Sequence, residues 1–142
     1  MATVRASLGD FAVTVQHVID LLHGYLALAQ RLHEAGPAFG GGWNFGPDHD
    51  GSKPVSWVID RCVQCWGGTA SWELDNEAYP AEAQLLHLDC AKARTLLGWR
   101  PRLPLEHAVG MTIEWYREVI RGADAMNLCL RQIDEFSGRG PG

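Results

Sequence analysis

Apolar residues recur at intervals of three and four over several stretches of the chain, which is the spacing of one face of an α-helix. Glycines at Gly36, Gly67 and Gly98 follow three of these stretches, and prolines at Pro54 and Pro104 precede two of them. Glycine favours the end of a helix, and proline suits its first turn because its missing N–H has no partner there. The pattern predicts five helices, at residues 15–32, 55–66, 89–97, 105–119 and 123–136.

Short runs of β-forming residues between turn signals predict extended segments at residues 43–45, 72–74 and 86–88. The fold class is therefore α-rich and mixed, with about five helices and a few short strands. The length of 142 residues predicts one domain, covering residues 1–136. The glycine-rich residues 137–142 are expected to form a flexible tail.

The charge balance argues against nucleic acid as a partner. Twelve Lys and Arg stand against seventeen Asp and Glu, for a formal charge of -5, so the average field repels a phosphate backbone. The most apolar early stretch, residues 11–32, is too polar for a bilayer span, because it is interrupted by Gln16, His17, Asp20, His23 and Gln30. The first ten residues also lack the apolar run of a signal peptide, and we therefore expect a cytoplasmic protein without a membrane partner.

The four cysteines do not predict a disulfide framework, because they are few and unevenly spaced. Cys62 and Cys65 have the spacing of half a zinc site or a redox pair. No second Cys or His pair follows at the spacing of a zinc finger, and both residues fall inside a predicted helix. We interpret them as ordinary helix residues with reduced thiols, and no metal site is predicted.

The loop at residues 46–53, GPDHDGSK, nearly matches a phosphate-binding loop. Ser52 and Lys53 are in reversed order, however, and Asp48 and Asp50 would repel a phosphate. A solvated loop before a helix is the preferred interpretation, since adjacent side chains in such a loop also converge poorly on one metal ion. His17 could either contact a ligand or cap its own helix, and its position at the helix start favours capping.

The chain carries no recognisable catalytic motif. It has no G-x-G-x-x-G or G-x-x-G-x-x-G, so no dinucleotide-binding fingerprint is present in the sequence. None of its three tyrosines has a lysine four residues later, and there is no nucleophile elbow or H-E-x-x-H. We therefore predict neither a catalytic residue nor a cofactor-binding residue in this chain.

Several segments, taken together and in order, resemble the C-terminal part of the CDP-glucose 4,6-dehydratases. These enzymes belong to the extended short-chain dehydrogenase/reductase family of nucleotide-sugar enzymes. The resemblance covers about residues 13–136. The segments are QHVIDLLHGYLALAQRL, WNFGP, VSWVID, PAEAQLLHLDCAKARTLLGWRPRLPL, TIEWYREV and GADAMNLCLRQIDEF.

The resemblance implies a C-terminal, substrate-binding subdomain of an extended Rossmann-type enzyme, without a complete Rossmann domain. In the family, NAD is bound by the other half, which also supplies the Tyr-x-x-x-Lys pair. The enzyme oxidises the hexose at C4, eliminates water across C5 and C6, and returns the hydride to C6. No catalytic residue is carried over to this chain, and its expected ligand is a nucleotide-sugar such as CDP-glucose.

Two residues that the family pattern would supply as substrate contacts are missing from this chain. The family reads Arg-Pro-Trp-Gln-His-Val where this chain has residues 13–18, so the Arg that meets the substrate diphosphate is replaced by Val13. The family also has a His where this chain has Ala81. The resemblance leaves five candidate substrate contacts, which are Gln16, His17, Asn44, Lys53 and Glu82.

The resemblance also bears on partners, because in the family the first helix and the strand near residues 43–45 pack onto the sheet of the cofactor half. Without that half, an apolar surface and an open strand edge would be exposed. We therefore expect a homo-oligomer or a separate cofactor-binding chain as partner. The leading interpretation is a truncated dehydratase-like domain that is not catalytic alone. The alternatives are an interaction module that completes a site in trans and a remnant without function.

Overall fold

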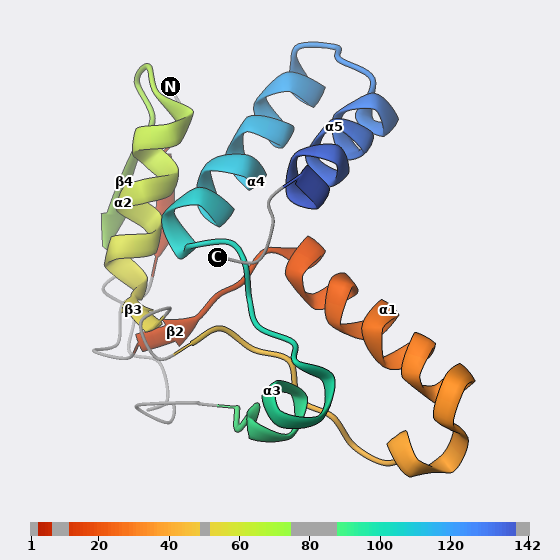
Figure 1. Ribbon diagram of the computed structural model, residues 1–142. Helices are drawn as coiled ribbons and strands as arrows, with labels where there is room; N and C mark the ends of the chain where they lie inside the picture. Colours follow the sequence, from red (N-terminus) through yellow and green to blue (C-terminus); the bar gives the residue numbers. More distant parts are fainter. Residues whose placement is uncertain (1–2, 7–11, 49–51, 75–87, 139–142) are drawn as a thin grey trace.

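The computed structural model describes residues 3–6, 12–48, 52–74 and 88–138, and these residues are mainly helical. The α-rich mixed fold that the sequence predicts is confirmed, and the described residues do not form a complete Rossmann domain. The described residues form five α-helices, one short 3-10 helix and four short strands (Figure 1). The helices are α1 (Val18–Ala35), η1 (Gly36–Phe39), α2 (Val55–Trp66), α3 (Ala91–Leu97), α4 (Leu105–Ile120) and α5 (Ala125–Gly138).

The strands form two separate pairs within the described residues. β1 (Thr3–Ala6) pairs in parallel with β4 (Ser71–Leu74), and β2 (Ala12–Thr14) pairs antiparallel with β3 (Ser52–Pro54). The extended segment predicted at residues 72–74 is confirmed as part of β4. The end of the loop predicted at residues 46–53 instead enters β3, which was not expected.

The strand predicted at residues 43–45 is wrong. The segment has no ladder partner, and side chains bind its backbone and position it instead. The Gln16 amide donates a hydrogen bond to the Phe45 carbonyl (3.3 Å), and the Lys92 ammonium donates one to the Gly42 carbonyl (3.1 Å). Of the segment predicted at residues 86–88, residues 86 and 87 lie outside the described residues, and Leu88 belongs to no strand.

The helix boundaries follow the local signals in the sequence. His17 caps α1, because its Nδ1 accepts a hydrogen bond from the Ile19 N–H (3.2 Å). The Asp89 carboxylate accepts one from the Ala91 N–H (2.8 Å) at the start of α3, and α3 ends at Gly98, whose φ of 65° is left-handed. α5 begins two residues later than predicted and continues to Gly138. That residues 1–136 form a single domain stays a prediction. The flexible tail expected at residues 137–142 also stays a prediction, since residues 139–142 lie outside the described residues.

Two small clusters form the core. The first contains Leu103, Ala108, Met111 and Phe136, with Ile19 of α1 packed against it. The second contains Phe45, Ala93 and Trp99, with four partly buried side chains around it. α4 packs beside α2 and also against α5, whereas α1 runs away from them toward α3 (Figure 1). The first turn of α1 therefore lies where the two clusters meet.

None of the described helices combines the length and the apolar character that a membrane span requires.

Candidate functional site

Gln16 is the candidate contact that the structure places most clearly at a cavity. It lies between β2 and α1, and its amide nitrogen donates to the Phe45 carbonyl. Its side-chain oxygen is buried and has no hydrogen-bond partner among the described residues. A buried acceptor without a partner costs free energy. The Gln16 side chain also lines a cavity, so its amide lies beside a space that can hold a ligand group.

The cavity beside Gln16 has a volume of about 300 Å³. Three segments distant in the sequence form its walls, namely residues 15–16, residues 47–48 and residues 101–105. Besides Gln16, its polar residues are Asp48, whose carboxylate is paired with the Arg94 guanidinium, and Arg102. The remaining wall is formed by valine, leucine and proline.

His17 caps α1, and it lines the space between α1, α4 and α5 rather than the cavity beside Gln16. Its side chain is only 6% exposed, and it caps α1 as the sequence predicts. Burial lowers the pKa of His17, with His107 acting in the same direction and Asp20 opposing it. His17 is therefore neutral at physiological pH, with one ring nitrogen already engaged.

Neither Asn44 nor Lys53 lines the cavity beside Gln16. The Asn44 amide donates to the Asp89 carbonyl (3.1 Å), which joins residues 43–47 to the start of α3. Lys53 lies on β3, and its ammonium group is 5.9 Å from the ring centroid of Trp57. Glu82 lies outside the described residues.

Lys53 is the direct cross-strand partner of Val13. The antiparallel register pairs Ala12 with Pro54, Val13 with Lys53 and Thr14 with Ser52. Side chains of directly opposed residues leave the same face of a β-ladder, with their Cβ atoms about 5 Å apart. The Lys53 side chain therefore projects from the same face of the β2–β3 ladder as the side chain of residue 13.

Arg102 lines the cavity but is not among the candidate contacts that the resemblance predicts. Arg102 lies in the turn between α3 and α4, and its guanidinium carbon is 5.3 Å from the ring centroid of Phe136. The only local signal is the proline-flanked pair of arginines at residues 100 and 102. That pair indicates a turn and gives no sign of which arginine enters a cavity.

No cluster of three His, Cys, Asp or Glu that could hold a metal ion occurs among the described residues. Burial raises the pKa of the Cys62 thiol, and the neighbouring Cys65 adds to the effect. A raised pKa keeps the thiol protonated and less reactive. This agrees with the interpretation of Cys62 and Cys65 as ordinary residues of α2.

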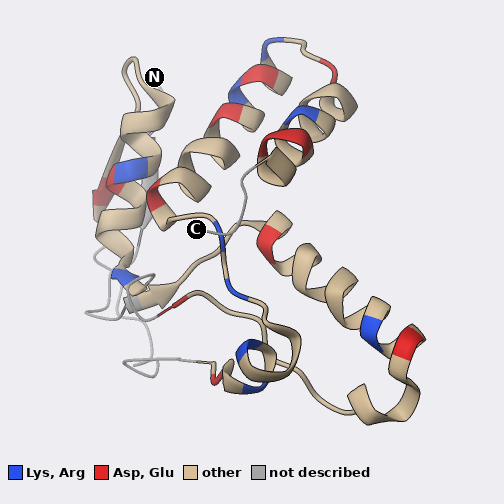
Figure 2. Cartoon of the chain, viewed as in Figure 1, with Lys and Arg blue, Asp and Glu red and all other residues tan. Residues whose placement is uncertain are grey.

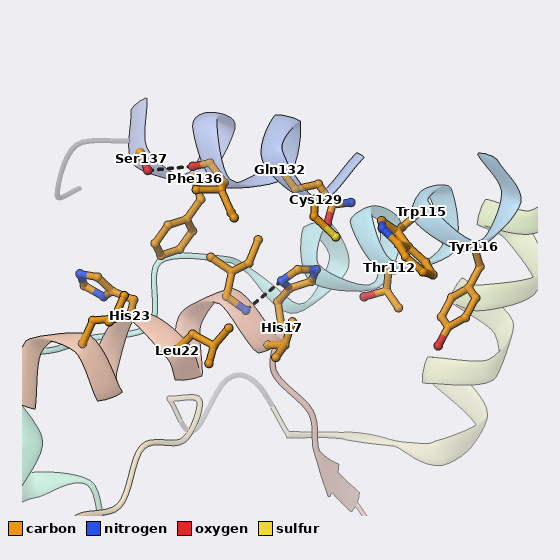
Figure 3. Close-up of a pocket in the computed structure, with 14 residues that line it drawn as sticks. His17, Leu22, His23, Thr112, Trp115, Tyr116, Cys129, Gln132, Phe136 and Ser137 are labelled. Atoms are coloured by element: carbon orange, nitrogen blue, oxygen red, sulfur yellow. Dashed lines mark hydrogen bonds between the residues drawn. The ribbon is translucent and has the colours of Figure 1, made fainter. Parts of the chain in front are cut away.

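A second and larger space, of about 590 Å³, lies between α1, α4 and α5, and we call it the α1–α5 groove. Figure 3 shows side chains of α1 on one side of it, among them His17 and Leu22, and Phe136 and Gln132 of α5 on the other. Trp115 and Tyr116 of α4 lie at one end. This space is open and apolar, and it is separate from the cavity beside Gln16.

Comparison with known proteins identifies a relative of this chain. No family model matches the chain. The chain is 44% identical over 121 residues to CDP-glucose 4,6-dehydratase from Salmonella typhimurium. It is a relative of the C-terminal part of the CDP-glucose 4,6-dehydratases. The match covers 85% of this chain and 34% of the Salmonella protein, so the chain spans about a third of the length of this relative.

The resemblance inferred from the order of the motifs is thereby confirmed. Each of the three walls of the cavity beside Gln16 contains residues of a segment that resembles the dehydratases, namely Gln16, Pro47 and residues 101–105.

Proposed function

We propose that this chain provides part of the sugar-nucleotide-binding surface of a CDP-glucose 4,6-dehydratase-type protein and does not catalyse dehydration alone. In this proposal NAD and the catalytic residues belong to another part of the enzyme, and the protein works in the cytoplasm on nucleotide-sugars. The relationship to a dehydratase supports the ligand class. The observation that carries the proposal is the cavity beside Gln16, with the polar residues Gln16 and Asp48 in its wall.

The size and chemistry of the cavity favour the hexose end of such a ligand. A volume of about 300 Å³ is at the lower limit of small-molecule sites, so it accommodates part of a nucleotide-sugar rather than the whole molecule. Sugar hydroxyls both donate and accept hydrogen bonds, which suits the polar side chains of Gln16 and Asp48 in the cavity wall. The carboxylate also disfavours a phosphate at this point.

We further propose that Lys53 supplies the cation for the diphosphate. The resemblance places an arginine at position 13, and Lys53 lies directly opposite that position on β3. A lysine is a point charge, whereas an arginine presents a fork of donors to a phosphate. The replacement therefore supports binding of the same ligand at lower affinity, which we expect to be roughly millimolar.

The test is a thermal-unfolding titration with CDP-glucose, CDP and NAD, followed by calorimetry. A ligand at ten times its Kd raises the free energy of unfolding by about 1.4 kcal/mol, which gives a rise of several degrees in Tm. CDP-glucose should raise Tm more than CDP does, and NAD should have no effect. Gln16→Ala should weaken the CDP-glucose effect, and Gln30→Ala, on the exposed part of α1, should not. No rise with CDP-glucose at tens of millimolar would overturn the proposal.

A further inference from the structure

The Lys53 side chain ends beside an aromatic ring, that of Trp57. The Lys53 ammonium lies 5.9 Å from the centroid of this ring, which belongs to the first turn of α2. A cation at this distance is attracted to the face of the ring. Because Lys53 projects from the same face of the β2–β3 ladder as residue 13, the Trp57 ring lies beside that face as well. Trp57 is partly exposed, so a ligand on this face reaches it.

Trp43 and Trp99, by contrast, are engaged within the protein. Trp99 is only 2% exposed. The ring of Trp43 is stacked with that of Phe39, with 6.0 Å between the centroids, and the Lys92 ammonium lies 4.1 Å from the centroid of Trp43. Both rings are thus occupied by protein side chains. Trp57 differs from them, because its charged neighbour is the cation that we propose for the diphosphate.

Lys53 lies between the cavity beside Gln16 and the start of α2. In the antiparallel register Ala12 pairs with Pro54, so α2 leaves the ladder at the end where β2 begins. Gln16 follows the other end of β2, about 10 Å further along the chain than residue 13. Figure 1 shows that α1 and α2 leave the two strands on different sides, and no residue of α2 lines the cavity. The order of cavity, cation and aromatic ring matches the order of hexose, diphosphate and base in a nucleotide-sugar.

The charges around the ladder fit this order. Lys53 is the one charged residue of β2 and β3, and the next charged residues along the chain are Asp60 and Arg61. Figure 2 shows this basic position at the foot of α2. The Asp60 carboxylate accepts a hydrogen bond from the indole of Trp72 (2.8 Å). A diphosphate is therefore attracted to Lys53, while the uncharged ring of Trp57 is suited to an aromatic group next to it.

We propose that Trp57 stacks on the nucleobase of the nucleotide-sugar that this chain binds. A cation that holds the backbone and an aromatic ring that holds the base are the usual means by which proteins bind nucleotides without reading the base. Trp57 thus adds affinity for the nucleotide and does not select one base over another. The inference rests on the proposed function and extends it to the base.

The test compares Trp57→Leu with a matched control, Trp66→Leu. Trp66 is the last residue of the same helix, nine residues or about 14 Å further along its axis. Calorimetry measures the binding of CDP-glucose and of glucose 1-phosphate, which has no base. Trp57→Leu should weaken CDP-glucose binding about fivefold or more and leave glucose 1-phosphate binding unchanged. Trp66→Leu should affect neither ligand, and Trp57→Phe should keep most of the affinity because it keeps a ring.

Tryptophan fluorescence gives a second readout if Trp57→Leu does not fold. A base that stacks on an indole quenches its emission. CDP should therefore quench part of the emission of the unaltered chain and of Trp66→Phe, and it should quench little in Trp57→Phe at the same saturation.

Three results would overturn the inference while the proposed function stands. They are CDP-glucose binding by Trp57→Leu that equals that of the unaltered chain, equal losses of both ligands, and full quenching in Trp57→Phe. Equal losses would assign the effect to damage of the fold and not to a missing base contact. If the unaltered chain binds no CDP-glucose, the proposed function fails, and the inference fails with it.

Discussion

The carboxylate of Asp20, in the first turn of α1, accepts a hydrogen bond from the backbone N–H of Leu103, 83 residues later in the chain (3.1 Å). Its other oxygen accepts one from the Arg102 N–H (2.8 Å), and its backbone carbonyl accepts one from the Trp99 indole (3.3 Å). Asp20 is fully buried. A buried carboxylate is tolerated only when such donors satisfy it, so Asp20 fixes the turn between α3 and α4 against α1. That turn is also one wall of the cavity beside Gln16.

Asp20→Asn should destabilise the protein by about 1–3 kcal/mol. The amide keeps only one acceptor oxygen, so one of the two backbone N–H groups loses its partner while it remains buried. Urea unfolding of this variant would be compared with that of Asp134→Asn, at an exposed position of α5. Equal stabilities of the two variants would contradict the role of Asp20.

The local features of this fold could be predicted from the sequence, whereas the long-range contacts could not. The helix starts and ends follow from residues such as Pro104 and Gly98, because caps depend on the nearest few residues. Asp20 is visible in the sequence only as an acidic residue near a helix start. Its partners, more than 80 residues away, follow from the packing of the whole chain.

The candidate site shows the same limit. The resemblance to a dehydratase identified Gln16, but the cavity beside it depends on residues 101–105, which the sequence indicates only as a turn. The prediction of a strand at residues 43–45 was wrong, because a β-forming pattern does not show whether a partner strand is available. Side-chain donors from Gln16 and Lys92 bind that segment instead.

Gly24→Ala should destabilise the protein by about 1–3 kcal/mol, because a Cβ at this position of α1 would lie 2.5 Å from Cδ1 of Phe45. The Phe45 ring cannot move away easily, since it is buried against Trp99 with 5.0 Å between the ring centroids. Gly110→Ala, in α4, is the matched control, because no atom lies within 4 Å of its added Cβ. That substitution should stabilise the protein by about 0.5–1 kcal/mol through its higher helix propensity. Thermal unfolding that shows Gly24→Ala to be neutral would contradict the close packing of α1 on Phe45.

The free energy of unfolding should decrease as pH falls below about 6.5, the ordinary pKa of histidine. Burial lowers the pKa of His17 and of His23 in the folded protein, so the unfolded chain takes up protons at a higher pH than the folded chain does. The stabilisation is complete above the unfolded value and is lost as pH falls toward the lowered folded values. Urea unfolding at pH 7.5, 6.5 and 5.5 would measure the slope.

The double variant His17→Asn, His23→Gln tests whether these two histidines cause the pH dependence of stability. Asparagine at position 17 keeps a capping oxygen at the start of α1. The double variant should show a shallower pH dependence than the unaltered chain. His33→Gln, at an exposed position near the end of α1, should leave the slope unchanged. An unchanged slope in the double variant would assign the pH dependence to other groups.

Lys53→Ala should weaken CDP-glucose binding several-fold, because it removes the cation opposite position 13. Val13→Arg should strengthen binding by about tenfold, since an arginine presents two parallel donors to a phosphate where lysine offers one point charge. Arg31→Ala is the control, because Arg31 lies on the exposed part of α1, where it pairs with Glu34. Calorimetry at two salt concentrations separates the roles, because a phosphate contact weakens with added salt and a sugar contact does not. The outcome that would contradict this role is a Lys53→Ala variant that binds CDP-glucose as tightly as the unaltered chain, with the same salt dependence. Lys53 would then not contact the diphosphate, and the ligand would be held through the cavity beside Gln16.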